Sequence, residues 1–297
     1  MIVAGSTSQA FAADLAAALD VELAAVEYDL FPDGELLAAA PGFDGDRAVV
    51  VAATTDSDTH VELLQLQDAV RAAGAEAVTT VLPYMGYARQ DDPVAPGKSA
   101  GESPPGYPLS ARAVARAIGA GTDRVVAVNV HERSVLEHFG VPARSVDAAA
   151  ALAGGLPDEL IDPVFVAPDE GALGLVEGAR DAYGRGTVDH FEKTRLSGES
   201  VEIRPSEVDV DGRDVVVVDD IVATGTTMSE SVAILRDRGA RRVFVATVHA
   251  VLARNALTKL RRAGVDAVVA TDTVERVVSE VSAAPAVADL LRDEGWA

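Results

Sequence analysis

The residues best suited to chemistry lie in one segment, VVVVDDIVATGTTM, residues 215–228. Four valines of an expected buried strand run into Asp219 and Asp220, and a helix is expected to start near Thr227. Gly225 lets the backbone approach a phosphate closely, and free N–H groups at a helix start bind anions. The two carboxylates are poor phosphate ligands, but they can accept hydrogen bonds from the vicinal hydroxyls of a ribose. A plain strand-to-helix turn with a threonine N-cap would explain one threonine but not the paired acids. The segment predicts a sugar-phosphate site formed by Asp219, Asp220, Ala223, Thr224, Gly225, Thr226 and Thr227.

A second candidate is a pair of cations, Lys193 and Arg195, in the extended segment FEKTRLSG (191–198). Residues two apart on a strand point to the same side, so both charges could act on one ligand. Two such cations suit the negative charge that develops on a transferring phosphoryl group. The alternative is a solvated strand edge on which lysine discourages aggregation. That alternative is weakened because the chain has only three lysines, Lys98, Lys193 and Lys259, among 25 basic residues.

The segment LFPDGEL contains residue types that can hold the base of a nucleotide. The ring of Phe31 can stack on a purine, and the carboxylates of Asp33 and Glu35 can accept hydrogen bonds from an exocyclic amine. The alternative is a plain tight turn formed by Pro32, Asp33 and Gly34. The residues alone leave both interpretations open.

Four further polar residues, Arg89, Gln90, His131 and Asp169, follow expected strands. Arg89 and Gln90 could meet the phosphates and base of a nucleotide, or could belong to a solvated loop. His131 ends an apolar strand, where a lone histidine is more often a satisfied core residue than a ligand. Asp169 offers the oxygen atoms that magnesium prefers, and it could also be the N-cap of the next helix.

These residues lie at the ends of short valine-rich runs that alternate with alanine-rich amphipathic stretches. Such alternation predicts an α/β fold with mostly parallel sheets that are covered by helices on both faces. The expected strands span 1–6, 47–54, 77–85, 123–131, 164–168, 188–195, 214–222, 242–251 and 267–272. The expected helices span 8–19, 58–73, 109–119, 132–139, 170–184, 226–239, 253–263 and 284–294.

A stretch rich in proline and glycine between residues 140 and 163 interrupts this alternation. We therefore expect a boundary near Gly140 between two tandem domains, 1–140 and 141–283, each an open sheet flanked by helices. The C-terminal segment 284–297 is expected to pack on the N-terminal domain.

Composition excludes several classes of protein. With 47 acidic and 25 basic residues, the chain carries a net charge of −22, which repels nucleic-acid phosphates. Cysteine is absent, so disulfide scaffolds, thiolate metal sites and cysteine nucleophiles are excluded.

Neither a signal-peptide pattern nor an apolar run of about 18 residues is present, so we expect a cytoplasmic protein without a membrane partner. Many acids and few lysines are typical of halophilic proteins, in which salt screens the repulsion; the alternative is an acidic protein from a low-salt organism.

Six segments resemble motifs of the ribose-phosphate diphosphokinase family, also called PRPP synthetases, and they follow that family's order. The sugar-phosphate segment resembles the motif that binds 5-phosphoribosyl 1-diphosphate (PRPP). The other five are LFPDGEL (30–36), LPYMGYARQDDP (82–93), VNVHERS (128–134), VAPDEGAL (166–173) and FEKTRLSG (191–198). A transferase that only consumes PRPP would need only one of these motifs, so the chain resembles an archaeal, halophile-like synthetase.

The resemblance implies two phosphoribosyltransferase-like domains that transfer the diphosphoryl group of ATP to the 1-hydroxyl of D-ribose 5-phosphate. It implies that Lys193 and Arg195 are catalytic, with Arg195 also contacting ribose 5-phosphate. It implies magnesium at His131 and Asp169. It further implies a homo-oligomer whose subunits share each ATP site, with ATP contacts from Phe31, Asp33, Gly34, Glu35, Arg89 and Gln90.

Three positions depart from the family pattern: Asn129 and Ala223 each replace an acid, and Thr226 replaces a glycine. Two other kinds of protein remain as alternatives. A type I phosphoribosyltransferase would lack the nucleotide segments and the Lys193–Arg195 pair. A non-catalytic regulatory paralogue would carry insertions or losses in the catalytic loop, against which the intact Lys193-Thr194-Arg195 argues.

Overall fold

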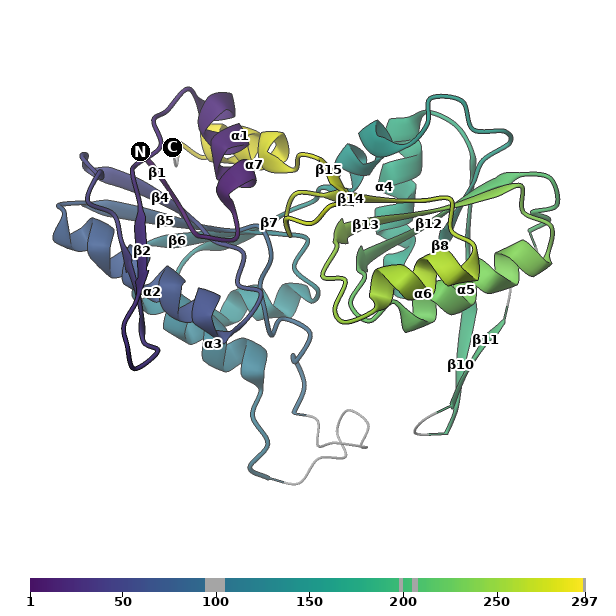
Figure 1. Ribbon diagram of the computed structural model, residues 1–297, viewed down its shortest axis with the longest axis horizontal. Helices are drawn as coiled ribbons and strands as arrows, with labels where there is room; N and C mark the ends of the chain where they lie inside the picture. Colours follow the sequence, from purple (N-terminus) through teal and green to yellow (C-terminus); the bar gives the residue numbers. More distant parts are fainter. Residues whose placement is uncertain (94–104, 198–199, 205–207, 296–297) are drawn as a thin grey trace. The chain divides into compact units, whose positions relative to one another are not determined.

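The computed structural model describes residues 1–93, 105–197, 200–204 and 208–295, and within these the side chains of 192–204 are outside the described part. The chain forms two compact units (Figure 1). The N-terminal unit comprises Met1–Val146, Thr273–Glu275 and Ser282–Ala297. The C-terminal unit comprises Asp147–Asp272 and Arg276–Val281.

A five-stranded parallel sheet forms the centre of the N-terminal unit, in the order β1-β4-β5-β6-β7. Its strands are β1 (Ile2–Ala4), β4 (Arg47–Val51), β5 (Ala77–Leu82), β6 (Arg124–Val128) and β7 (Ala143–Val146). Helices α2 (Ser57–Ala72) and α3 (Ser110–Ala120) lie on one face, and α1 (Gln9–Leu19) and α7 (Ala284–Asp293) pack together on the other (Figure 1). Because both faces are covered, the four residues that follow Arg47 in β4 are all buried.

By its contacts the first unit extends to Val146, six residues beyond the Gly140 at which the boundary was expected. The reason is β7, which lies beyond Gly140 yet pairs in parallel with β6 and so completes the first sheet. A short 3-10 helix, η1 (Arg133–His138), occupies the place of the helix expected over 132–139.

A hairpin of β2 (Glu27–Leu30) and β3 (Leu36–Ala39) stands apart from the central sheet. Gln65 of α2 holds it at the β3 strand. The Gln65 Nε2 donates to the Leu36 carbonyl (2.9 Å), and its Oε1 accepts from the Ala38 N–H (2.7 Å). All four residues of β2 are exposed, but the Tyr28 hydroxyl donates to the Ala4 carbonyl of β1 (2.5 Å), so both strands of the hairpin are tied to the unit by polar contacts.

The C-terminal unit is built on a six-stranded parallel sheet in the order β15-β14-β13-β12-β8-β9. Its strands are β8 (Val164–Ala167), β9 (Thr187–His190), β12 (Asp214–Ile221), β13 (Arg242–His249), β14 (Ala267–Thr271) and β15 (Ser279–Val281). Helices α5 (Thr226–Asp237) and α6 (Ala256–Ala263) lie side by side on one face (Figure 1). On the other face, α4 (Leu173–Tyr183) packs with the 3-10 helix η2 (Ala149–Gly155), and a second 3-10 helix, η3 (Glu170–Ala172), precedes α4.

The strand order of this sheet reverses between β8 and β12. The chain first adds β9 on one side of β8, then returns to place β12 on its other side. In open parallel sheets, ligands bind at the carboxyl ends of the strands where such a reversal occurs. The fold therefore points to the residues that follow β8 and β12.

A second hairpin, β10 (Glu192–Ser197) and β11 (Ser200–Arg204), follows β9. Lys193 lies opposite Ile203 and Arg195 opposite Val201 in its antiparallel register. The predicted α/β class with mostly parallel, helix-flanked sheets is confirmed.

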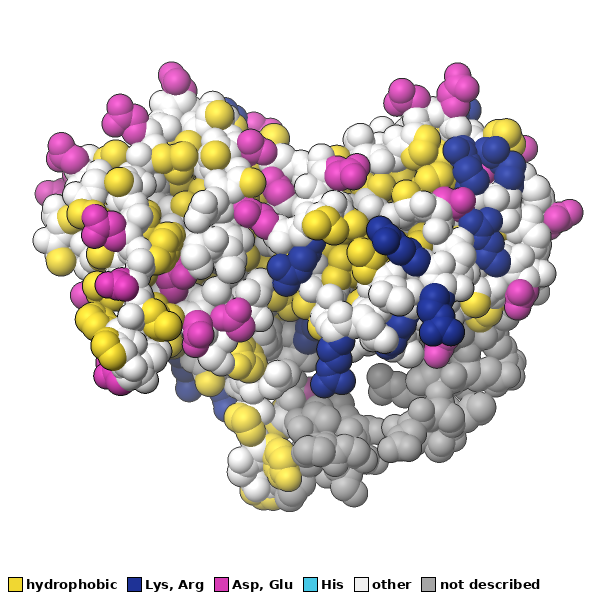
Figure 2. Space-filling view, in the orientation of Figure 1, with side chains coloured by type: hydrophobic (Ala, Val, Ile, Leu, Met, Phe, Trp, Pro, Cys, Tyr) yellow, Lys and Arg dark blue, Asp and Glu magenta, His cyan; other side chains and the backbone are white. Residues whose placement is uncertain are grey.

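Acidic side chains are spread over the face shown in Figure 2, whereas lysine and arginine gather mainly on its C-terminal unit. No helix within the described residues combines the length and apolarity needed to cross a membrane.

Candidate active site

The sugar-phosphate loop, residues 222–227, comprises the connection from β12 to α5 and the first two residues of α5, at the strand-order reversal. Gly225 is the N-cap of α5 and has φ +69°, a left-handed conformation that favours glycine. A Cβ at Gly225 would also lie 3.2 Å from the Cβ and carbonyl oxygen of Ala256 on α6. The left-handed conformation and the close packing on α6 both favour glycine at this position.

The first turn of α5 provides the donors of this loop. Its sequence, TTMS, contains no acid, so the N–H groups at the helix start face no carboxylate of their own turn. The hydroxyl oxygens of Thr224 and Thr226 lie 3.4 Å apart beside these groups. Hydroxyl donors, N–H donors and the positive end of a helix dipole are the groups that bind a phosphate in proteins.

Two half-buried carboxylates, Asp219 and Asp220, end β12 directly before the loop. Burial raises the pKa of Asp219 well above its ordinary value, and the charges of Asp220 and Asp169 raise it further. The Asp220 N–H donates to the Asp219 Oδ1 (2.9 Å), which offsets part of this effect. Such carboxylates gain from hydroxyl donors or from a cation, so ribose hydroxyls and a divalent ion both fit their surroundings.

Asp169 follows β8 and is the N-cap of η3. Its Oδ1 accepts from the Gly171 N–H (3.1 Å), so the N-cap role proposed from the sequence is present. β8 and β12 are neighbouring strands, and the charge of Asp169 helps to raise the pKa of Asp219 at the end of β12. Within the described residues, no three histidine, aspartate or glutamate side chains converge as the ligands of one metal ion.

Lys259 of α6 was not singled out as a site residue by the sequence analysis. Its Nζ donates to the Thr226 Oγ1 (2.8 Å) and to the Thr224 carbonyl (3.2 Å). The one available signal in the sequence was the scarcity of lysine, which had drawn attention to Lys193 instead.

Three candidates of the N-terminal unit follow its central strands at their carboxyl ends. Arg89 and Gln90 are exposed on the loop after β5, and His131 is exposed after β6. The Gln90 N–H donates to the Tyr87 carbonyl (2.9 Å), and the Gln90 carbonyl accepts from the Ala111 N–H of α3 (3.1 Å). Because β5 and β6 are parallel neighbours, these residues share one edge of the sheet.

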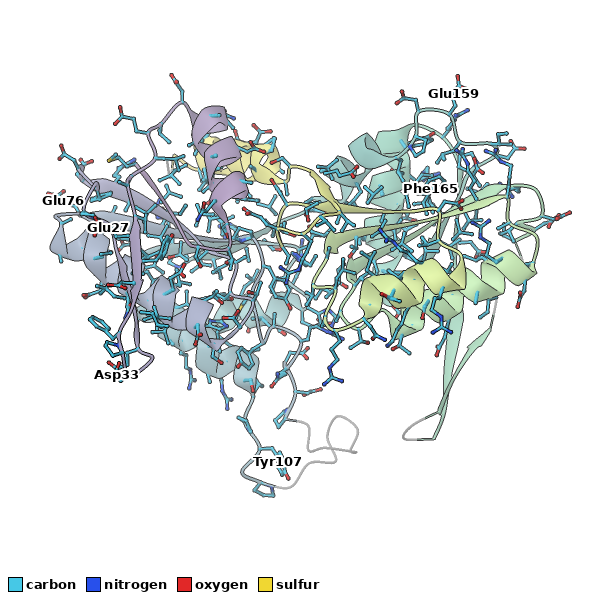
Figure 3. The ribbon with its side chains drawn as sticks, in the orientation of Figure 1. Glu27, Asp33, Glu76, Tyr107, Glu159 and Phe165 are labelled. Atoms are coloured by element: carbon cyan, nitrogen blue, oxygen red, sulfur yellow. The ribbon has the colours of Figure 1, made fainter. Side chains whose placement is uncertain are left out.

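Phe31, Asp33, Gly34 and Glu35 form the tip of the β2–β3 hairpin, where Figure 3 labels Asp33. The turn is closed by a bond from the Phe31 N–H to the Glu35 carbonyl (2.7 Å) and by Gly34 at φ +95°. The Phe31 side chain is 45% exposed. The tight turn proposed as one reading is therefore present, and it leaves the aromatic ring available to a ligand.

The structure thus gathers the sugar-phosphate residues and Asp169 in the C-terminal unit, and the nucleotide candidates and His131 in the N-terminal unit. Lys193 and Arg195 lie on β10, whose side chains are outside the described part.

Comparisons with known proteins agree with this division. Residues 142–284 match the phosphoribosyl transferase domain, which is the class of fold that the reversed parallel sheet and its sugar-phosphate loop define. Residues 1–120 match the N-terminal domain of ribose phosphate pyrophosphokinase. The chain belongs to the ribose-phosphate pyrophosphokinase family.

Relatives and a solved structure cover nearly the whole chain. A ribose-phosphate pyrophosphokinase of Halobacterium salinarum is 60% identical over 98% of this chain and 100% of its own length. One from Methanosarcina mazei is 46% identical over 98% of this chain and 94% of its own. The crystal structure of phosphoribosylpyrophosphate synthetase from Mycobacterium smegmatis superposes with a TM-score of 0.79 at 28% identity, covering 99% of this chain and 98% of that one.

Proposed function

We propose that this protein is a ribose-phosphate diphosphokinase. It transfers the diphosphoryl group of ATP to the 1-hydroxyl of D-ribose 5-phosphate and releases PRPP and AMP. The observation that carries this proposal is the sugar-phosphate loop at the strand-order reversal, in a chain whose N-terminal domain matches ribose phosphate pyrophosphokinases.

Ribose 5-phosphate binds at the loop that connects β12 to α5. Its phosphate accepts hydrogen bonds from the N–H groups at the α5 start and from the threonine hydroxyls of the loop. Its ring hydroxyls donate to Asp219 and Asp220, which end the strand next to the loop. Hydrogen bonds to charged groups are each worth roughly 1.5–3 kcal/mol, so these contacts are sufficient to orient the sugar.

ATP binds through the exposed candidates of the N-terminal unit, Arg89 and Gln90, together with a hairpin tip from a second subunit. In that tip, Phe31 stacks on the adenine, and Asp33 and Glu35 accept from its amine. The exposed apolar residues of the hairpin support a role in assembly, since Leu30 is 66% exposed and Phe31 45%.

Asp169 would hold magnesium together with the substrate phosphates, and His131 would be a further ligand. The role of Asp169 is supported by the acids at the end of β12, because burial and the like charges of Asp220 and Asp169 raise the pKa of Asp219, and a cation would relieve this repulsion. When bound, the ion neutralises phosphate oxygens and so lowers the repulsion against an attacking oxygen.

In the transfer step, the 1-hydroxyl oxygen of the ribose forms a bond to the β-phosphorus of ATP and loses its proton. The bond from the β-phosphorus to the oxygen that bridges the α- and β-phosphates breaks, and AMP leaves with that oxygen. Lys193 and Arg195 stabilise the charge that develops on the transferring group and on AMP.

The test is to incubate the full chain with ATP, magnesium and ribose 5-phosphate in about molar KCl, where charge repulsion is screened. AMP and PRPP should appear in equal amounts, and only when ribose 5-phosphate is present. A phosphoribosyltransferase would consume added PRPP together with a base and would not produce AMP from ATP. A regulatory paralogue would bind the substrates without forming either product. Either of these outcomes would overturn the proposal.

A further inference from the structure

The segment between β13 and α6, residues 250–255, packs against the sugar-phosphate loop. The Leu252 N–H donates to the Val222 carbonyl (2.9 Å), and the Ala253 N–H donates to the Ala223 carbonyl (2.9 Å). Leu252 has φ +46°, in the left-handed region, which a residue other than glycine adopts only where its surroundings enforce it. These two backbone hydrogen bonds therefore hold the segment 250–255 against the loop.

Helix α6 follows this segment, and its Lys259 reaches the sugar-phosphate loop. Lys259 is half-buried, and its Nζ donates to the Thr226 Oγ1 (2.8 Å) and the Thr224 carbonyl (3.2 Å). Thr226 is the first residue of α5, at the positive end of the helix. Lys259 thus brings a formal charge to the place where the loop offers its anion donors.

The contact also fixes what the Thr226 hydroxyl can do. Its oxygen accepts from the ammonium group, so its hydrogen points to an acceptor other than Lys259: the Thr224 Oγ1, which lies 3.4 Å away, or a bound ligand. A hydroxyl that accepts from a cation is polarised and becomes a stronger donor itself. At the start of α5, the acceptor that benefits most is a phosphate oxygen.

We propose that Lys259 is a positioning residue for the phosphate of the sugar substrate, acting through the Thr226 hydroxyl. This proposal rests on the proposed binding of ribose 5-phosphate at the loop. It also gives a reason for Thr226, which stands where the family pattern has a glycine: a glycine has no hydroxyl for a lysine to orient.

The experiment measures ribose 5-phosphate binding by calorimetry, without ATP, on the full chain and its variants. Lys259→Met should weaken binding about tenfold, the lower end of the effect of removing a charged hydrogen-bond partner. Lys259→Arg, which keeps a cationic donor, should recover part of that loss. Arg261→Met is the matched control, because it removes one charge from the same helix at an exposed position; it should change binding by less than about twofold.

A double-mutant cycle separates positioning from charge alone. In a Thr226→Ala background, Lys259→Met should weaken binding much less than in the wild type, whereas a Thr226→Ser background should keep the full effect. In the assay of AMP formation, Lys259→Met should raise KM for ribose 5-phosphate about tenfold and leave KM for ATP and kcat within about threefold. A thermal midpoint near that of the wild type shows that the variants fold.

Unchanged affinity in Lys259→Met would overturn the inference. An equal loss in the Thr226→Ala and wild-type backgrounds would overturn it too, because the lysine would then act without the threonine. The same experiment separates this inference from the proposed function. If the wild type itself bound no ribose 5-phosphate, the proposed function would fail. If the wild type bound it and Lys259→Met bound it equally well, only the role of Lys259 would fail.

Discussion

The paired acids at the end of β12 should determine affinity for the sugar and not for the nucleotide. Asp220→Ala removes an acceptor for a ribose hydroxyl, a contact worth roughly 1.5–3 kcal/mol. We expect KM for ribose 5-phosphate to rise about tenfold or more, with KM for ATP little changed. Steady-state kinetics with each substrate varied in turn checks this. Asp237→Ala, at the exposed end of the helix α5 that follows the loop, is the charge control. A rise confined to KM for ATP would contradict the assignment of Asp220.

Lys193 is expected to act mainly in the transition state. Lys193→Ala should lower kcat by on the order of 10²-fold, the effect of removing one donor that stabilises developing charge, with smaller changes in either KM. Lys98→Ala, which alters a lysine outside the six sequence motifs, should leave kcat unchanged. A Lys193→Ala enzyme with kcat within about threefold of wild type would refute the catalytic role.

The residues of the sugar-phosphate loop could be predicted from the sequence because all of them lie within one short segment. Residue type and spacing alone indicate a glycine-capped helix after two acids. Lys259 could not be found in this way. It lies 33 positions from Thr226, and only the packing of α6 beside α5 brings the two together.

At the scale of the element, β12 is anchored at its start by a buried carboxylate. Asp214 is fully buried, and its oxygens accept from the Ile161 N–H (2.7 Å), from Arg242 (2.7 and 3.2 Å) and from Arg241. Burial alone would raise the pKa of Asp214, but the hydrogen bonds from Arg242, Arg241 and Ile161 lower it to about 2. This cluster holds the base of the strand whose other end carries the paired acids.

Asp214 should make stability depend on pH in the acid range. Its folded pKa of about 2 lies below the ordinary value, so its contribution is fully present above about pH 4 and is lost as pH falls towards 2. Asp214→Asn should lower the free energy of unfolding by on the order of 2 kcal/mol at pH 7. Urea unfolding of both proteins at constant KCl should show this difference shrinking below about pH 4. A difference independent of pH would mean that the charge of Asp214 does not stabilise the fold.

Most central strands and helices were predictable because parallel strands buried on both faces are continuous valine runs. The hairpins were not. In β2 all four residues are exposed, so no apolar pattern marks the strand, and only the turn at Asp33 and Gly34 was visible. The expected strand 188–195 is two strands, β9 and β10, separated at Phe191. Phe191 is buried, and its N–H donates to the Ala167 carbonyl (2.9 Å), which ties this point to the end of β8.

At the scale of the molecule, the charge is the dominant feature, with 47 acidic against 25 basic residues. Acidic side chains are spread over the surface in Figure 2, so folding brings like charges together. Their repulsion reaches about 30 Å at 0.01 M salt but only about 3 Å at 1 M.

Family membership was predictable from six ordered motifs and is confirmed. The place of β7 in the first sheet could not be predicted from the sequence, because this strand follows the glycine at which the boundary was expected.

This charge predicts a dependence on salt. The thermal midpoint and the activity should both rise as KCl increases from about 0.05 M towards molar concentrations, since screening favours the compact state. Scanning calorimetry and the AMP assay over this range provide the check. A thermal midpoint that stays flat or falls would refute the halophilic interpretation and leave the proposed reaction unaffected.

The central claim is that a diphosphoryl group moves as one unit from ATP to the sugar. Phosphorus NMR of the full chain with ATP, magnesium and ribose 5-phosphate in molar KCl follows every phosphate directly. We predict that the three ATP signals are replaced by AMP and by the paired signals of a diphosphate attached to the ribose, in equal amounts and without ADP. The appearance of ADP with a singly phosphorylated sugar, or of unchanged ATP, would contradict the account.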